Sequence, residues 1–186
     1  MTIKEILQTV ATITARKDVK EYLNNTNLAT SENTVETVNS LIELTNLVIN
    51  ELACSYIPAI TLEKAIATKG KVYYRDLLKT PLKVLRVVDE SGENVPFKTF
   101  PEFISVDGVS VWIEYEYAPD KKGLDEDICY MEKDLPMRVL AYGVASEYCI
   151  TEGAFDEAVM WHKRYTDGVA DVCLPKNALT ARRRWA

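Results

Sequence analysis

The sequence predicts an α+β protein, a mainly helical bundle into which a small antiparallel β module is inserted. Apolar residues recur at helical spacing near residues 3–23, 33–56, 135–152 and 154–171. Short segments rich in β-branched and aromatic residues fill the block between the second and third of these stretches. The predicted organisation is a bundle of residues 1–59 and 120–175, a β module at 60–119 and a flexible basic tail at 176–186. The chain has 186 residues and is 47% hydrophobic, which suffices for a sizeable core.

The spacing of apolar residues in the N-terminal region predicts two helical stretches. Thr2 and Glu5 have the spacing of a capping box, which indicates a helix start at the beginning of the chain. The segment 18–23 either continues this helix or restarts it after a break near Ala15. The next helix is capped by Ser31 or Asn33 and ends before Pro58, because the residue before a proline disfavours helical geometry.

The β module is predicted to contain strands at 72–74, 82–89, 95–100, 103–106 and 109–117. A hairpin turn is expected at 90–93. A second, of type I′, is expected at Asp107-Gly108, because both central positions of that turn need positive φ. Apolar residues alternate with polar ones after Gly108, which predicts a half-buried strand with one solvated face. The acidic and basic segment 120–127 is expected to be a solvated loop.

Residues 134–172 are predicted to form a helical hairpin, with Asp134 as the N-cap and Gly153 at the turn. Small residues at 141, 143 and 145 predict close helix packing midway along the first helix. One apolar face is expected on each helix. The first face comprises Leu135, Val139, Tyr142, Ala145 or Ser146 and Cys149, and the second comprises Phe155, Ala158, Val159, His162, Tyr165 and Val169.

Composition argues against several functional classes. A net charge of −6 and a pI near 5.0 disfavour a main surface that grips nucleic acid. The four cysteines have no CxxC spacing and there is one histidine, so we expect reduced, buried thiols and no metal or cofactor. No apolar run is long enough to cross a membrane and no leader is recognisable, which favours a cytoplasmic protein.

Few residues suggest catalysis. The sequence has no nucleophile elbow, dinucleotide fingerprint, P-loop or zinc-protease motif. Glu114 and Glu116 share a predicted strand face and form a possible carboxylate pair, although a solvated face explains them equally well. Asp125, Glu126 and Asp127 lack the spacing of a calcium loop. His162 is interpreted as a structural histidine, and the chain is predicted not to be an enzyme.

The C-terminal tail is the candidate binding segment. Arg182, Arg183 and Arg184 precede Trp185, and this combination of bidentate donors with a rigid aromatic side chain is enriched at binding hot spots. The alternatives are a frayed, solvated terminus and a phosphate-binding segment. We predict that the tail is disordered in the free protein and becomes ordered on a partner protein.

Taken together, the chain resembles the head–tail adaptor (connector) proteins of tailed bacteriophages, of the type that carries a β insert. The resemblance rests on the N-terminal helices, the inserted segments GKVYYRDL, VLRVVDESGENVPF and VSVWIEYEYAP, the returning hairpin RVLAYGVASEYCITEGAFDEAVMWHKRY and the ending RRRW. It implies a homo-oligomeric ring, a dodecamer in the expected assembly, in the neck of the virion and assembled in the host cytoplasm. The tail would bind the portal protein, the opposite side a tail or stopper protein, and DNA would pass through the channel without sequence-specific binding.

Three functional hypotheses remain open at this point. The first is the adaptor, or a neighbouring neck, head-completion or tail component. The second is a regulatory binding module whose helical hairpin presents a groove to a peptide or a nucleic acid. The third is an enzyme that uses Glu114, Glu116 or His162.

Overall fold

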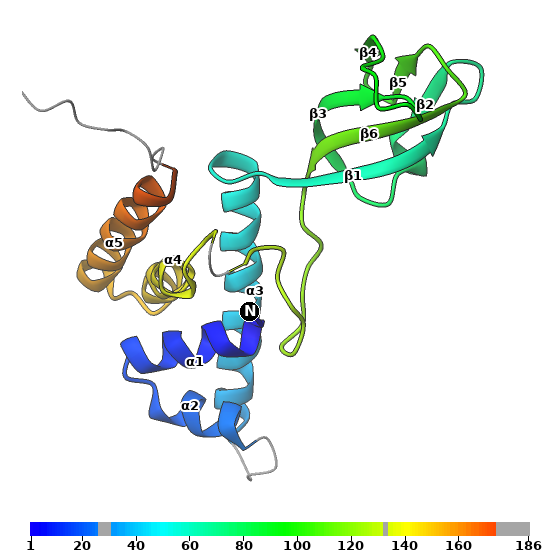
Figure 1. Ribbon diagram of the computed structural model, residues 1–186. Helices are drawn as coiled ribbons and strands as arrows, with labels where there is room; N and C mark the ends of the chain where they lie inside the picture. The colour runs from blue at the N-terminus through cyan, green and yellow to red at the C-terminus, as the bar shows by residue number, and fades with distance from the viewer. Residues whose placement is uncertain (26–30, 132–133, 174–186) are drawn as a thin grey trace, which may run out of the picture. The chain divides into compact units, whose positions relative to one another are not determined.

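The computed structural model describes residues 1–25, 31–131 and 134–173, and its fold is α+β (Figure 1). The helices are α1 (Ile3–Ile13), α2 (Lys17–Asn24), α3 (Glu32–Ser55), α4 (Met137–Thr151) and α5 (Phe155–Cys173). The strands are β1 (Ala59–Ile66), β2 (Lys71–Tyr73), β3 (Pro81–Val88), β4 (Phe97–Thr99), β5 (Phe103–Val106) and β6 (Ser110–Tyr117), and a 3-10 turn, η1 (Tyr74–Asp76), follows β2.

The chain divides into two compact units. The helical unit comprises Met1–Val48 with the described part of Lys122–Ala186, and the β unit comprises Ile49–Lys121. The β unit therefore begins within the last turns of α3, whereas the predicted β module begins at residue 60.

The N-terminal helix restarts instead of continuing. The capping box of Thr2 and Glu5 is formed in both directions, which confirms the predicted helix start. Ala15 has φ of 56°, a left-handed conformation that interrupts the helical ladder, so α1 ends at Ile13 and α2 begins at Lys17.

The charged segment before the hairpin is tied to the N-terminus. The amide of Ile3 donates to the carbonyl of Glu126, the amide of Lys4 donates to the carbonyl of Leu124, and the amide of Ile128 donates to the carbonyl of Met1. The expectation of a merely solvated loop is therefore wrong for this segment. Two of its carbonyl groups accept hydrogen bonds from amides that the first turn of α1 leaves without a partner inside the helix.

Helices α4 and α5 form the predicted hairpin, with Gly153 in the left-handed conformation at φ of 75°. The predicted N-cap is wrong, because Pro136 occupies that position and makes no side-chain capping bond. The small-residue prediction is confirmed at Gly143. A Cβ there would lie 2.9 Å from Cγ1 of Val48 on α3 and 3.0 Å from the ring of Tyr165 on α5.

The predicted faces of the hairpin need correction. Helix α4 is buried on nearly every side, because α1, α3 and α5 all pack against it. Helix α5 packs mainly on α4 and buries only a narrow stripe. That stripe contains Trp161, which was not predicted to lie on the apolar face. Phe155, Val159 and His162 were predicted on that face, but they are exposed.

The β unit contains two three-stranded antiparallel sheets, ordered β1-β6-β3 and β2-β5-β4. Strand β1, which the sequence did not predict, pairs along its whole length with β6, from Ala59 opposite Tyr117 to Ile66 opposite Ser110. Its polarity is inverted: Thr61 and Glu63 are less exposed, while Ile60 and Leu62 face solvent. The core between the sheets is formed by residues such as Ile104, Val106, Val111, Ile113 and Tyr115.

One of the two predicted hairpins does not form. β5 and β6 belong to different sheets, and of Asp107 and Gly108 only the glycine has positive φ, at 134°, so the connection is not a type I′ turn. The turn at 90–93 is present. The carboxylate of Asp89 accepts bonds from the amides of Ser91 and Glu93, both at 2.9 Å, and Val88 bridges to Asn94.

Candidate functional site

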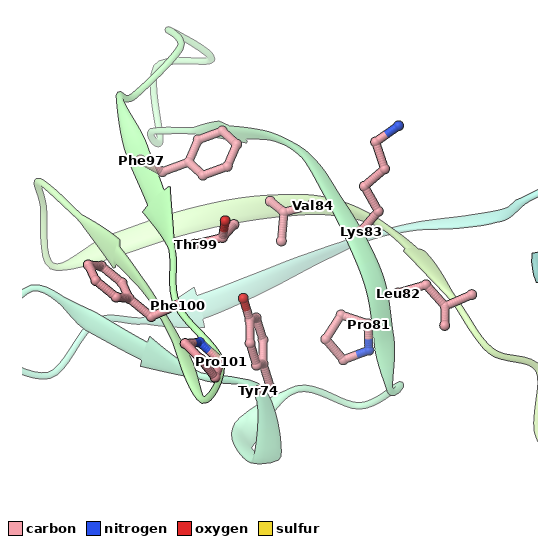
Figure 2. Close-up of a pocket in the computed structure, with 9 residues that line it drawn as sticks. All are labelled: Tyr74, Pro81, Leu82, Lys83, Val84, Phe97, Thr99, Phe100 and Pro101. Carbon is pink, nitrogen blue, oxygen red and sulfur yellow. The ribbon is translucent and has the colours of Figure 1, made fainter.

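A pocket of about 490 Å³ opens in the β unit between β3 and β4 (Figure 2). Its lining combines aromatic, proline and aliphatic side chains with one cation: Tyr74, Pro81, Leu82, Lys83, Val84, Phe97, Thr99, Phe100 and Pro101. Figure 2 shows Tyr74 projecting between the strand of Pro81 and Val84 and the strand of Phe97 and Thr99.

The lining of this pocket offers apolar contacts and a few polar groups. Loss of solvent around the phenol raises the pKa of Tyr74 above its ordinary value, so its hydroxyl stays a neutral donor. The lining residues include no carboxylate, histidine or cysteine that would pair as a base or nucleophile. Aromatic and proline surfaces of this kind accept apolar side chains of an extended peptide.

A second polar site, which the sequence analysis missed, centres on Glu63 of β1. Its carboxylate accepts hydrogen bonds from the Tyr115 hydroxyl at 2.7 Å and from the Leu78 amide at 3.0 and 3.1 Å. Burial and the neighbouring Glu63 raise the pKa of Tyr115 to about 12. The site joins β1 and β6 to the turn after η1, so its evident role is structural. A glutamate at an inward strand position was its only sequence signal.

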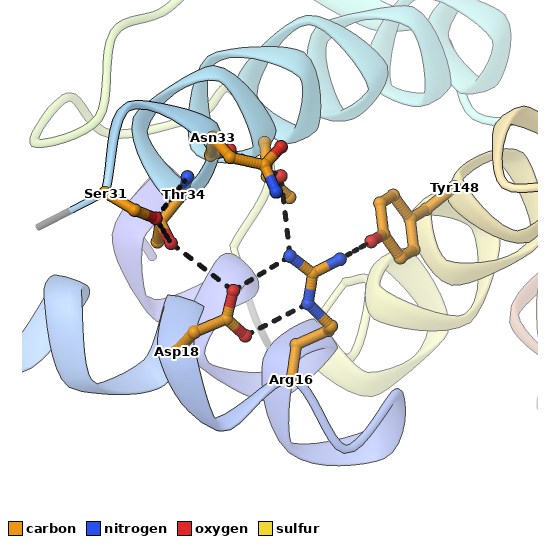
Figure 3. A network of polar contacts seen from close by, with 7 residues as sticks. Arg16, Asp18, Ser31, Asn33, Thr34 and Tyr148 are labelled. Carbon is orange, nitrogen blue, oxygen red and sulfur yellow. Dashed lines mark hydrogen bonds and ion pairs between the residues drawn. The ribbon is translucent and has the colours of Figure 1, made fainter.

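A polar network links helices α2, α3 and α4 in the helical unit (Figure 3). Arg16 donates to the Asp18 carboxylate at 2.8 and 3.0 Å, to Thr37 of α3 at 3.4 Å, and to the hydroxyl of Tyr148 on α4. Thr34 donates to Asp18 at 3.5 Å. The hydrogen bond from Arg16 lowers the pKa of Asp18 to about 2. Every charge in the network is matched, so it stabilises the helix arrangement.

The predicted carboxylate pair is engaged in ion pairs. Glu114 pairs with Arg86, and Glu116 lies 3.8 Å from Lys83, both across the ladder between β6 and β3. Each glutamate thus has a cationic neighbour of its own, as cross-strand pairs commonly do.

His162 and the acidic loop also differ from expectation. His162 is exposed on α5 and lies 6.3 Å, ring to ring, from Tyr165. Asp127 pairs with the N-terminal ammonium at 3.1 Å, and Glu126 lies 3.8 Å from Lys122. Within residues 1–25, 31–131 and 134–173, no three His, Cys, Asp or Glu side chains are grouped as metal ligands would be.

The expectation that the cysteines are buried holds for one of them. Cys149 is buried, which raises the pKa of its thiol. Cys54, Cys129 and Cys173 are exposed, and no disulfide bond joins cysteines within the described residues.

An arginine–aromatic surface lies on the hairpin and was not predicted. It consists of Arg138 and Tyr142 of α4 with Trp161 and Arg164 of α5. The Tyr142 and Trp161 rings stack with centroids 5.5 Å apart. The Arg138 and Arg164 guanidiniums lie 5.5 and 5.8 Å from the Tyr142 centroid, and that of Arg164 lies 4.9 Å from Trp161. Such stacked guanidiniums retain their in-plane donors for an anion.

The predicted binding tail, Arg182, Arg183, Arg184 and Trp185, lies outside the described residues. Among the described helices, none combines the length and the apolar character that a membrane-spanning segment needs. No protein-family model matches the chain, and no curated protein is significantly similar to it.

Proposed function

We propose that this chain is a head–tail adaptor of a tailed bacteriophage. In this proposal, copies form a ring in the neck of the virion that joins the portal to the tail or stopper and surrounds part of the DNA channel. The observation that carries it is the order of parts. N-terminal helices and a returning helical hairpin build one unit, and a β unit is inserted between them. This is the order in which the chain resembles the adaptors that carry a β insert.

Charge is consistent with this role. A chain of net charge −6 repels the phosphates of DNA, so DNA can slide past without being held. The carboxylates that suggested acid–base chemistry, Glu114 and Glu116, are accounted for by cross-strand ion pairs. The ion pairing of these two glutamates therefore favours an assembly protein over an enzyme that uses them.

The C-terminal segment 176–186 would bind the portal, with Trp185 as an anchor and Arg182, Arg183 and Arg184 as donors to carboxylates. One segment per copy makes the attachment multivalent. Weak single contacts then become strong together, because later segments bind at high effective concentration.

Portal binding tests the proposal directly. Purified protein is mixed with portal rings at physiological salt and the bound fraction is measured by sedimentation. We expect the full chain to bind, deletion of 176–186 to abolish binding, and Trp185→Ala to lose most of it. A change of Arg182, Arg183 and Arg184 to lysine serves as the control that keeps charge. Full binding by the truncated chain would refute the assignment of the tail, and failure of the full chain to bind would refute the adaptor role.

A peptide-binding module is a second candidate, because the pocket of the β unit has aromatic and proline walls. Its binding would survive deletion of 176–186 and be lost on Phe97→Ala or Phe100→Ala. The two functions thus predict opposite responses to the same pair of variants.

A further inference from the structure

The arginine–aromatic surface has unmatched positive charge. Neither Arg138 nor Arg164 forms an ion pair with a carboxylate of the described residues, although both are exposed. The indole N–H of Trp161 is buried and has no acceptor among those residues. Stacking orders both guanidiniums in advance, so a carboxylate that binds them loses less side-chain entropy than it would on free arginines.

A complementary surface lies on α3 of the same unit. Glu36, Ser40, Glu43 and Leu47 follow one another at intervals of four, three and four residues, so they share one helix face. We call this face the acidic stripe. All four residues are exposed, Leu47 by 55%, and neither glutamate pairs with a cation in the described part of the chain.

The two surfaces match in spacing. Glu36 and Glu43 are seven residues apart, about 10 Å along a helix. The Arg138 and Arg164 guanidiniums lie 5.5 and 5.8 Å from the centroid of the Tyr142 ring, so they are at most about 11 Å apart. Two carboxylates on one helix face can therefore reach both guanidiniums at once.

The two surfaces also match in order. Met160, exposed by 41%, lies four residues before Arg164 on α5, and Leu47 lies four residues after Glu43 on α3. Val139 of α4 packs against Gly168 of α5, so the neighbouring Arg138 lies level with the turn of α5 that follows Arg164. An α3 laid antiparallel to α5 thus sets Leu47 on Met160, Glu43 on Arg164 and Glu36 on Arg138.

We propose that the acidic stripe of one copy docks on the arginine–aromatic surface of a second copy of this chain. Figure 1 shows α4 between α3 and α5, and at Gly143 it meets Val48 of α3 and Tyr165 of α5. The two patches are different surfaces, so the contact is heterologous and repeats from copy to copy, which closes into a ring when the rotation allows. The inference rests on the proposed function for the ring, but the contact itself does not need the portal.

Charge reversal provides the test. The first variant carries Arg138→Glu and Arg164→Glu, and the second carries Glu36→Arg and Glu43→Arg. All four positions are exposed, so both variants are expected to fold, which circular dichroism and thermal melting check. Self-association is measured by sedimentation over a wide concentration range. We expect each variant alone to associate on the order of tenfold more weakly than the native chain, because like charges then face each other.

Mixing the two variants restores opposite charges at every contact. The acidic stripe of the first variant meets the native arginines of the second, and the introduced arginines meet the introduced glutamates. We therefore expect the equimolar mixture to recover the association of the native chain. His162→Glu is the matched control and should leave association unchanged, because His162 is exposed on α5 but lies two residues from both Met160 and Arg164, on another side of the helix.

Cross-linking checks the geometry. In a chain with Cys54, Cys129 and Cys173 changed to serine, Leu47→Cys together with Met160→Cys should give a ladder of covalent oligomers on oxidation. Leu47→Cys with His162→Cys should not, because His162 is exposed on another side of α5. A native chain that never self-associates, a mixture no better than its components, or equal ladders from both cysteine pairs would each overturn the contact.

The contact and the adaptor role fail in different ways. If the protein binds the portal but the charge-reversed variants associate as the native chain does, the contact is refuted and the adaptor role stands. If mixing the two variants restores association but no protein binds the portal, the contact stands and the adaptor role is refuted.

Discussion

Arg16 illustrates how much one side chain can organise. Its guanidinium bonds Asp18 at the start of α2, Thr37 on α3 and Tyr148 on α4, so three helices are set by one planar group (Figure 3). The hydrogen bond to Asp18 is the main cause of the raised pKa of Arg16 and of the lowered pKa of Asp18.

This coupling makes part of the stability dependent on pH. The pKa of Asp18 is lowered from 3.8 to about 2, so its stabilisation is complete above pH 3.8 and disappears as the pH falls towards 2. We expect Asp18→Asn to lower the free energy of unfolding by about 1 kcal/mol at pH 7, because the carboxylate is half-exposed. Urea unfolding at pH 7, 4 and 2 measures it. A difference that persists unchanged at pH 2 would contradict the coupling.

Gly143 lies where α4 closely approaches α3 and α5. We expect Gly143→Ala to reduce the free energy of unfolding by about 1–2 kcal/mol, because the added methyl group would press on Val48 and the ring of Tyr165. The gain in helix propensity offsets only part of this cost. A double-mutant cycle with Val48→Ala measures the clash. Additive effects of the two substitutions would show that the two positions do not press on each other.

At the scale of elements, burial depends on how many neighbours an element has. Helix α4 packs against three helices and is buried on nearly all sides. Helix α5 has fewer neighbours and is buried only along a narrow stripe. Strand β1 shows the reverse situation, since its larger aliphatic side chains lie outward and a hydrogen-bonded glutamate lies inward.

The hairpin interface gives a matched pair of variants. Val139 is buried and packs against Gly168, whereas Val159 on α5 is 71% exposed. We expect Val139→Asp to cost at least about 3 kcal/mol, because it buries an unpaired charge, and Val159→Asp to change stability by less than about 0.5 kcal/mol. Thermal melting of both proteins provides the measurement. Equal melting temperatures would mean that the face of α4 is wrongly assigned.

At the scale of the whole molecule, the chain has two cores in two units. The core of the β unit is formed by side chains from both sheets, with Ile104 and Ile113 fully buried. The helical unit has its own core of α1, α2, α4 and α5 residues, among them Leu7, Leu23, Leu140 and Tyr165.

Because the two units have separate cores, we expect a cavity in the core of one unit to destabilise that unit alone. Ile113→Ala removes three carbon atoms from the β core, and we expect it to cost about 3 kcal/mol there. Hydrogen exchange read by mass spectrometry should then speed up in residues 59–117, while α4 and α5 keep their protection. Faster exchange in all of these segments would mean that the two units unfold together.

The local features of the fold were largely predictable. The capping box at Thr2, the glycine turn at 153, the close approach at Gly143 and the alternation of β6 follow from local steric rules and hydrophobic period, and the structure confirms each. The candidate sites were less predictable. Glu63, Arg138 and Arg164 are ordinary surface residue types, and only their neighbours across helices and strands make them part of a site.

The sequence alone determined the fold class, the hairpin and the block of strands, because helical and strand periods act over a few residues. Tertiary structure alone decided the pairing of β6 with β1 and β3 in place of β5, because register depends on partners distant in the chain. It also decided which side of α5 is buried, since the sequence offered Phe155 and Val159 as readily as Trp161. An apolar residue on a helix can be buried, but the elements that pack beside the helix decide whether it is buried.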